Sequence, residues 1–499
     1  SQLKRFKDAA WHQQASARID HAHMMEHRLL PDQIHNYAHN NEWLCRNWIN
    51  LGDRAAALDM AMSLLSNPRH PKLNSMEGKP KSFRYGRMRL LQILEKFELW
   101  EDTLELANTE WLEPLDNPDH DLPRLRLIGL AHYGLEQRDA LNDVLSELDE
   151  LREALQTKHE SAKTEARAKA EKEKKKPEEI EKIVKDAGKK ESGQLNRIKS
   201  IRSELEGCLA ALDGKTDEAL KSLEKSGRPR YTLALEHLRL GDKEKADSIS
   251  KKEVEAHKGE TLPLAARILV LHELGKTEEA RACFEDLRQI SSQIDLAAPP
   301  FARLRPIAKE FDLPENWRLP YEVPDDFGER PDLSEVGPIH WTPPTAPPFK
   351  LPDQNGLPVD LEEYRGKPLI LVFYLGYGCL HCTEQLNAIA DQIETFNKEG
   401  LPVLAVSTDT VPELAKSQAN YAKGSNEFPF PLIADPEKNI FKTYGAHDDF
   451  ENQALHGTFL LDPKGRILWS DISADPFMEL DFLIKESHRL LRLHQEKRE

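Results

Sequence analysis

The sequence has few cysteines, few aromatic residues and no long hydrophobic run. Only five of its 499 residues are cysteine, and 7% are aromatic. Five scattered cysteines exclude a disulfide-rich scaffold, because such scaffolds need several pairs within a short chain. The longest uninterrupted apolar stretch, 369–375, is far shorter than the ~20 residues that cross a bilayer, so no membrane span is expected.

Positive charge is also in short supply. Lys and Arg number 69 against 86 Asp and Glu, which gives a formal net charge of -17. Such an acidic chain does not suit the phosphate backbone of nucleic acids, so nucleic acid is not an expected partner. A chain of this length predicts roughly three domains. Its charged fraction of 31% indicates that part of it is solvated helix or linker rather than core.

Proline divides the chain. Twelve of the 32 prolines lie in residues 299–348, and we expect a stiff, extended linker there that holds no helix. The residues before this stretch have helical patterns, whereas those after it alternate between strand and helix patterns. The predicted fold class is therefore a multidomain protein, with an all-α region followed by an α/β domain.

The all-α region carries a recurring pattern in which a glycine is followed five positions later by an alanine. It occurs at Gly52/Ala57, Gly214/Ala219, Gly241/Ala246 and Gly275/Ala280. The glycine would end the first helix of a pair, and the small alanine would let the second helix pack closely. This pattern resembles tetratricopeptide (TPR) repeats, and the resemblance implies stacked helix pairs whose concave face binds a protein partner.

A long charged stretch interrupts the repeats. Apolar residues at helical spacing over 141–155 and 180–209 flank a tip near 174–177 that is rich in Lys and Glu. This pattern predicts two long helices that fold back on each other. We interpret the tip as a solvated helix face rather than a binding site, because its basic residues are interleaved with glutamates.

The C-terminal part has strand and helix signals in a specific order. The pattern predicts a hairpin at 349–356, a buried strand over 367–374, a tight turn at 376–378, a helix over 379–398, a parallel strand over 401–409, a helix from 412, a hairpin over 457–469 and a last helix from about 475. A βαβ unit followed by a hairpin and a helix is the order of a thioredoxin fold.

Several short motifs in this part are typical of one family. They are Leu-Pro-Asp at 351–353, Tyr-Arg-Gly-Lys-Pro at 364–368, Val-Ser-Thr-Asp at 406–409, Phe-Pro-Leu-Ile-Ala-Asp at 430–435 and Thr-Phe-Leu-Leu-Asp-Pro-Lys-Gly at 458–465. Together they resemble the peroxiredoxin/redoxin family of AhpC/TSA type. The resemblance implies a thioredoxin fold and thiol-disulfide or peroxide chemistry, with protein thiols, protein disulfides or peroxide as substrates.

These signals divide the chain into five parts. They are a TPR-like α-helical domain at 1–140, a long charged helical hairpin at 141–212, TPR-like helical repeats at 213–298, a Pro-rich linker at 299–348 and a redoxin domain at 349–499.

The redoxin domain contains the pair Cys379-Leu-His-Cys382. A thiolate in the first turn of a helix faces unpaired backbone N–H groups and the positive end of the helix dipole, which lower its pKa. A protonated His381 would add a positive charge as a modulator. The Leu-His pair resembles the Pro-His of periplasmic disulfide oxidases, which favours an extracytoplasmic location, although a cytosolic redoxin is compatible with the same residues.

The family resemblance also predicts which residues surround the sulfurs. Aligned on Phe373-Tyr374, the positions of the peroxiredoxin proline, threonine and peroxidatic cysteine hold Leu375, Cys379 and Cys382. The position of the distant arginine holds His456, which is either a proton carrier or a structural histidine. We therefore favour disulfide exchange, in which Cys379 attacks and Cys382 resolves. In a peroxidase, the two roles would be reversed.

Two other interpretations remain. His23-Met-Met-Glu-His27 fits the H-x-x-E-H pattern of inverted zinc proteases, but Pro31 ends the segment and no peptidase scaffold surrounds it. No second C-x-x-C accompanies the first, so neither a metal nor a cofactor is expected.

The alternative to an enzyme is an interaction scaffold in which the helical repeats bind partners and the redoxin domain is weak or inactive.

Overall fold

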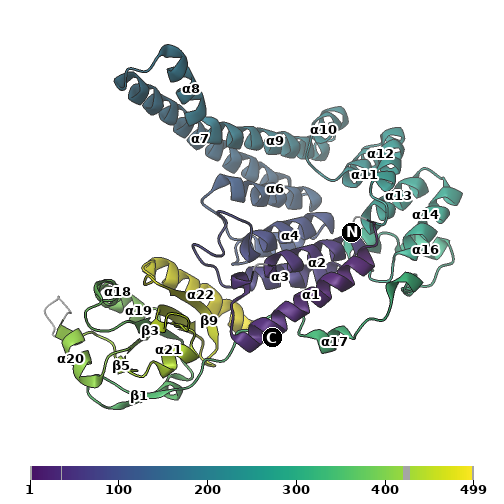
Figure 1. Ribbon diagram of the computed structural model, residues 1–499. Coiled ribbons are helices and arrows are strands. Elements are labelled where there is room, and N and C mark those ends of the chain that lie inside the picture. Colours follow the sequence, from purple (N-terminus) through teal and green to yellow (C-terminus); the bar gives the residue numbers. More distant parts are fainter. Residues whose placement is uncertain (1–2, 35, 420–426, 497–499) are drawn as a thin grey trace. The chain divides into compact units, whose positions relative to one another are not determined.

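The computed structural model describes residues 3–34, 36–419 and 427–496 (Figure 1). It separates into two compact units. The first unit comprises Ser1–Ser16, Ala38–Leu65 and Met76–Pro331, and the second comprises Ala17–Tyr37, Ser66–Ser75 and Asp332–Glu499. Among the described residues, no helix combines the length and apolar character needed to cross a bilayer.

Helices make up most of the first unit. They are α1 (Phe6–His27, which continues into the second unit), α2 (Tyr37–Leu51), α3 (Arg54–Ser66), α4 (Ser82–Lys96), α5 (Trp100–Leu106), α6 (Pro118–Gly134), α7 (Arg138–Lys172), α8 (Pro177–Ala187), α9 (Lys189–Leu212), α10 (Thr216–Leu223), α11 (Arg230–Arg239), α12 (Lys243–Ala256), α13 (Thr261–Glu273), α14 (Thr277–Gln289), α15 (Pro299–Ala302) and α16 (Arg305–Glu310). The predicted all-α region is confirmed.

The glycine and alanine pattern marks the turns of helix pairs. All four glycines have positive φ, between 70° and 90°, and each follows the first helix of a pair. The four alanines are fully buried in the second helix. Glu98 and Glu136 take the same left-handed conformation after α4 and α6, with φ of 56° and 57°. Two further pairs therefore exist where no glycine indicates them, and their assignment to the TPR class stays a prediction.

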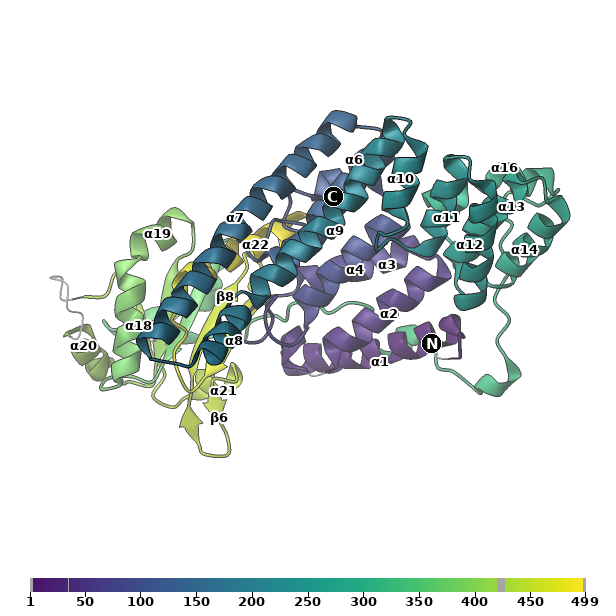
Figure 2. The same ribbon diagram turned by 90° about the horizontal axis from the view of Figure 1, so that it is seen from above.

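The charged stretch forms the expected hairpin. Helices α7 and α9 run side by side, and the chain turns back between residues 172 and 177 (Figure 2). Leu141 and Leu148 of α7 are buried in one core with Leu205 and Cys208 of α9. The second arm is not one continuous helix, because Gly188 separates α8 from α9.

The expectation that residues 299–348 hold no helix is wrong. Helices α15, α16 and α17 (Leu333–Val336) lie within them, and a 3-10 turn covers Asp325–Phe327. Proline stands in the first turn of α15 and of α16, where the missing N–H has no helical partner to lose. Helix α16 ends just before Asp312, which takes the left-handed conformation with φ of 57°.

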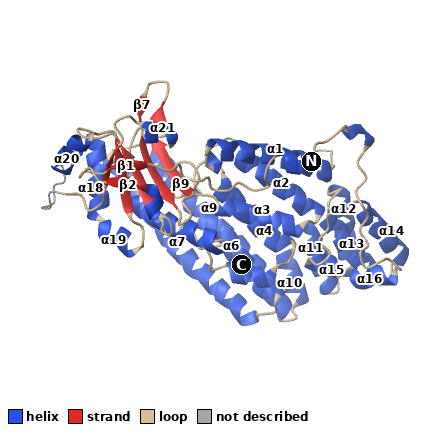
Figure 3. Cartoon of the chain, turned by 90° about the horizontal axis from the view of Figure 1, so that it is seen from below, coloured by secondary structure: helices blue, strands red, loops and turns tan. Residues whose placement is uncertain are grey.

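A five-stranded sheet forms the centre of the second unit (Figure 3). The strands of the unit are β1 (Lys350–Pro352), β2 (Pro358–Asp360), β3 (Leu369–Tyr374), β4 (Val403–Ser407), β5 (Leu432–Ala434), β6 (His447–Asp448), β7 (Gln453–Ala454), β8 (His456–Leu461) and β9 (Ile467–Ser473). The order in the sheet is β5-β4-β3-β8-β9, with β3, β4 and β5 parallel and β8 and β9 antiparallel. This arrangement confirms the predicted thioredoxin fold.

Helices cover both faces of the sheet. They are η3 (Leu361–Tyr364), α18 (Leu380–Asp391), α19 (Ile393–Lys398), α20 (Val411–Ala419), α21 (Asn439–Thr443) and α22 (Leu480–Glu496). Ile370 and Val372 of β3 pack in a core with α18 and α22, whereas Leu371 and Phe373 pack with α21 on the other face. All six residues of β3 are buried, which explains why this strand reads as a continuous apolar run. Helix α22 begins at Leu480, later than the expected start near 475.

Residues 66–75 belong to the same unit as the C-terminal domain. The indole N–H of Trp469 on β9 donates to the carbonyl of Arg69 at 2.7 Å. The guanidinium of Arg489 on α22 donates to the carbonyl of Asn67 at 2.8 Å. Composition and periodicity carry no sign of such long-range contacts, and the five-part division of the chain stays a prediction.

Candidate active site

The loop between β3 and α18 is held by residues that follow β4. Gly376 has φ of +93°, and a side chain there would collide with the carboxylate of Asp409. Both oxygens of that carboxylate accept a hydrogen bond from the N–H of Tyr377, at 2.9 Å. The hydroxyl of Thr408 donates to the carbonyl of Leu375 at 2.8 Å. The sequence analysis assigned no role to Asp409, although it ends the Val-Ser-Thr-Asp motif.

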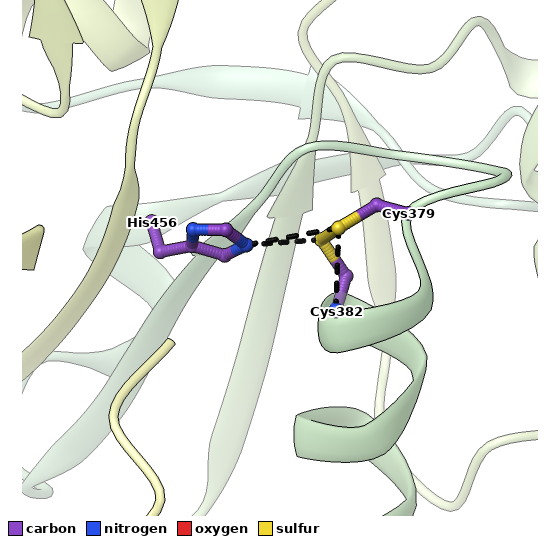
Figure 4. Close-up of side chains that lie close together, drawn as sticks. All are labelled: Cys379, Cys382 and His456. Carbon is purple, nitrogen blue, oxygen red and sulfur yellow. Dashed lines mark hydrogen bonds between the residues drawn. A yellow bond between two sulfur atoms is a disulfide. The ribbon is translucent and has the colours of Figure 1, made fainter. Parts of the chain in front are cut away.

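The loop brings the two cysteines to the start of α18 (Figure 4). Cys379 is the N-cap residue, and its sulfur accepts the N–H of Cys382 at 3.2 Å. The two sulfur atoms lie next to each other, with Cα atoms 5.3 Å apart, a separation that suits a disulfide. Cys379 is partly exposed, whereas Cys382 is 1% exposed. An incoming group in solution therefore meets Cys379 first.

The sulfur of Cys382 also contacts the backbone of the loop. The N–H of Leu375 donates to it at 3.3 Å. The peroxiredoxin motif has proline at this position, and a proline has no N–H to donate. The replacement by leucine thus adds a hydrogen bond to the buried sulfur.

His456 lies against both sulfurs. Gly457 pairs with Phe373 across β3 and β8, so His456, the first residue of β8, falls beside the end of β3 where the cysteine loop begins. Its Nε2 is 3.2 Å from Sγ of Cys382 and 3.8 Å from Sγ of Cys379. The side chain is buried, with 4% of the residue exposed.

The other ring nitrogen fixes the tautomer of His456. Its Nδ1 lies 2.7 Å from the carbonyl oxygen of Ala474, which can only accept, so Nδ1 carries a hydrogen. In the neutral ring, Nε2 then points a lone pair at the sulfurs. Burial lowers the pKa of His456, and this effect outweighs the hydrogen bond to Ala474, which raises it. The ring is therefore poised to accept a proton from a thiol.

His381 does not join this cluster. Its side chain is 68% exposed, and its Nδ1 is 3.3 Å from a carboxylate oxygen of Glu384. An exposed charge next to a carboxylate is screened by water and by its partner. Its role as a modulator stays a prediction.

Gln385 is a site neighbour that the sequence analysis did not identify. It lies one turn after Cys382 on α18 and is 1% exposed. Its side-chain amide donates to the hydroxyl of Thr458 at 3.2 Å and to the carbonyl of Phe477 at 3.0 Å. It therefore ties α18 to β8 and to the segment before α22. Only its helical spacing from Cys382 pointed to this position.

The other candidate residues stay apart from this site. The rings of His23 and His27 lie on α1 with centroids 4.4 Å apart. In the part of the chain that the structure describes, the only group of three possible metal ligands is Cys379, Cys382 and His456. Among the described residues, no third metal ligand therefore joins His23 and His27.

The remaining cysteines are free and buried. They are Cys45, Cys208 and Cys283. Burial raises the pKa of each to about 12. A thiol with such a pKa is not a nucleophile near neutral pH.

Comparison with known proteins places this site in a family. The model of the AhpC/TSA family matches residues 344–470. Thioredoxin peroxidase of Fasciola hepatica is 31% identical over 139 residues, which are 27% of this chain and 68% of that protein. The chain belongs to the AhpC/TSA family. Chloroplastic peroxiredoxin Q of Sedum lineare is 35% identical to its AhpC/TSA domain over 122 residues, which are 24% of this chain and 63% of that protein.

A solved structure also resembles the AhpC/TSA domain. The crystal structure of peroxidoxin BcpB from Mycobacterium tuberculosis is 24% identical, covers 30% of this chain and 97% of its own, and has a TM-score of 0.27. Membership of the AhpC/TSA family indicates a redox enzyme of the thiol peroxidase or thiol oxidoreductase kind. The relatives match about a quarter of the chain, so the activity of the whole chain is a matter for proposal.

Proposed function

We propose that the AhpC/TSA domain catalyses thiol-disulfide exchange with protein substrates through Cys379 and Cys382. One observation carries this proposal. Two adjacent sulfurs differ in access, since Cys379 is partly exposed at the N-cap of α18 while Cys382 is buried behind it. This is the division of labour that an attacking and a resolving thiol need.

The reaction starts from the reduced pair. The thiolate of Cys379 attacks one sulfur of a substrate disulfide, the substrate bond breaks, and the second substrate sulfur leaves as a thiolate that takes up a proton. Nε2 of His456 then accepts the thiol proton of Cys382. The Cys382 thiolate attacks Sγ of Cys379, which releases the substrate as a dithiol and forms the Cys379–Cys382 disulfide. Two electrons pass to the substrate, and the reverse sequence oxidises a substrate dithiol.

Exposed apolar side chains beside the pair favour a protein substrate over peroxide. Tyr377, Leu380 and Met478 are 53%, 68% and 47% exposed. Tyr377 and Leu380 flank Cys379 in the sequence, and Met478 follows Phe477, whose carbonyl accepts from Gln385 on α18. Large apolar side chains around a reactive group are typical of surfaces that contact other proteins.

The residues around the sulfurs also favour exchange. A peroxidase of this family uses an arginine to polarise peroxide, and His456 stands at that position with a lowered pKa. A neutral imidazole lacks the fixed positive charge of a guanidinium. It is suited to moving a proton between thiols.

Trapping of the mixed disulfide tests the proposal. Cys382→Ser should accumulate a covalent complex with a reducible protein substrate such as insulin, because Cys379 can attack but nothing resolves the product. Cys379→Ser is the matched control and should form no such complex. Equal trapping by both variants, or an unchanged exchange rate in both, would refute the assigned roles.

Peroxide reduction is the second candidate, because the sulfur of Cys382 accepts a hydrogen bond from the N–H of Leu375 and lies 3.2 Å from Nε2 of His456. In that reaction Cys382 attacks peroxide and becomes a sulfenic acid, and Cys379 condenses with it and releases water. Peroxide added to Cys379→Ser should then leave a sulfenic acid on Cys382. Peptide mass analysis detects it as oxygen added to the peptide that contains Cys382, so no reagent has to reach this buried sulfur. Absence of the added oxygen at millimolar peroxide would exclude this reaction.

The helix pairs of the first unit are proposed to bind a protein partner, as their resemblance to TPR repeats implies. The alternative is a scaffold whose AhpC/TSA domain is inactive. The same cysteine variants decide between them, because a scaffold would show neither a trapped complex nor a sulfenic acid.

A further inference from the structure

The active site gathers three possible metal ligands, and no carboxylate of the described residues belongs to the group. Two sulfurs and one imidazole nitrogen, from Cys379, Cys382 and His456, lie within 4.8 Å of one another. The nearby carboxylate of Asp409 is already occupied by the N–H of Tyr377 and the hydroxyl of Ser417. Thiolate ligands select Cu(I) and zinc, and imidazole suits both metals.

The spacing of these atoms is close to that of a ligand set. With metal–sulfur and metal–nitrogen bonds of about 2.3 Å and 2.0–2.1 Å, ligand atoms around one ion lie about 3.5–4 Å apart. Nε2 of His456 is already 3.2 Å and 3.8 Å from the two sulfurs. The remaining adjustment is the separation of the sulfurs, which follows when a disulfide is reduced.

The hydrogen bond behind His456 orients the ring for a metal. Histidines that bind metals almost always donate their other N–H to a carboxylate or a backbone carbonyl. The Nδ1–H of His456 does this with Ala474 O at 2.7 Å. The N–H of Leu375 and the N-terminus of α18 would offset the negative charge of the thiolates.

We infer that the reduced site binds one Cu(I) ion through Cys379, Cys382 and His456. Cu(I) is soft and accepts three ligands, whereas Zn(II) usually takes a fourth. Two electrons from a dithiol reductant first open the disulfide. The ion then displaces both thiol protons and bonds to two thiolates and the neutral Nε2, with no change in the oxidation state of copper. Cu(I) binding would go beyond the proposed exchange activity and would not depend on it.

Competition against a chromogenic Cu(I) chelator tests this inference. The full-length chain is reduced, freed of reductant without oxygen and titrated with Cu(I). We expect it to withhold one ion per chain. The oxidised chain should withhold none, and it is a strict control because Cys45, Cys208 and Cys283 remain free thiols in it. Equal binding by the two forms would overturn the inference.

Variants then identify the ligands. Cys379→Ser and Cys382→Ser should each lose the bound ion, and His456→Ala should weaken affinity by at least about 10–100-fold. His381→Ala is the matched control, because this exposed histidine contacts Glu384 and not the sulfurs, and it should stay within about twofold of the parent. Circular dichroism of each variant confirms folding. An unchanged affinity in His456→Ala would refute the three-ligand site.

Two further outcomes separate the possibilities. X-ray absorption at the copper edge should show two sulfur and one nitrogen neighbours, and a Zn(II) affinity above that for Cu(I) would overturn the assignment of the metal. The insulin exchange assay is run on the same preparations. Failure to bind copper with intact exchange refutes this inference alone, whereas copper binding without exchange refutes only the proposed function.

Discussion

Replacement of His456 by glutamine should raise the pKa of the Cys382 thiol by about one to two units. Nε2 of His456 is 3.2 Å from the Cys382 sulfur, and His456 is 4% exposed. A hydrogen bond to a charged group contributes about 1.5–3 kcal/mol, and each pKa unit corresponds to about 1.4 kcal/mol. The neutral ring accepts the Cys382 proton at Nε2, so the thiolate forms beside an imidazolium. Without this partner, the thiolate population should fall about 10–100-fold at intermediate pH.

The measurement is the thiolate absorbance near 240 nm as a function of pH. It is made in a Cys379→Ser background, because two neighbouring thiols titrate as a coupled pair. The other three cysteines do not interfere, since burial raises their pKa values to about 12. Absorbance needs no reagent to reach the sulfur, which matters because Cys382 is 1% exposed.

The control is His381→Gln in the same background. That side chain is 68% exposed and lies beside Glu384, so solvent screening should keep its effect well below that of His456. A change below about half a pKa unit in the His456 variant, or an equal change in the His381 variant, would show that Nε2 of His456 does not stabilise the thiolate.

Three further predictions concern the loop, a buried histidine and the buried cysteines. Gly376→Ala should destabilise the protein more than Gly378→Ala in urea unfolding. Both glycines have positive φ, which costs an alanine about 1–2 kcal/mol, but only a side chain at 376 would also collide with Asp409. Equal losses of stability in the two variants would contradict this. Burial lowers the pKa of His21 to about 4. Between pH 6.5 and about 4, the unfolded chain therefore takes up a proton that the folded chain does not. The free energy of unfolding should fall as the pH falls, by about 2 kcal/mol at pH 5. His21→Gln should reduce this pH dependence in urea unfolding. Iodoacetamide at pH 7.5 should label Cys379 in the reduced native chain and spare the three buried cysteines, as peptide mass analysis can check; labelling of those three would mean that they are not packed as described.

The sequence predicted the C-terminal fold well because its signals are local. The apolar run of β3 and the glycines after it mark a buried strand and a tight turn without any knowledge of distant residues. The position of His456 was also predictable, through its offset from Phe459 in a familiar motif. Its contact with the sulfurs was not, because that depends on the pairing of β8 with β3.

Other structural features could not be predicted from the sequence, for physical reasons. Glu98 and Glu136 adopt the left-handed turn that glycine usually indicates, so two helix pairs had no visible boundary. Prolines in residues 299–348 argued against helix, yet proline in a first turn permits one. The role of Asp409 depends on two strand ends lying at the same edge of the sheet, which is a tertiary property.

Because of the contacts of residues 66–75, the AhpC/TSA domain cannot be separated from the chain without losing hydrogen bonds. The N–H of Arg69 donates to Glu486 at 2.7 Å, and Glu486 forms a buried ion pair with Arg489, which in turn donates to Asn67. A fragment that starts at residue 349 would leave this ion pair and the indole N–H of Trp469 without those backbone partners. A buried pair stripped of its hydrogen bonds is destabilising. The family match covers residues 344–470, whereas the unit that folds around this domain also includes residues 66–75. A gene fragment cut at the family boundary would therefore encode an incomplete core.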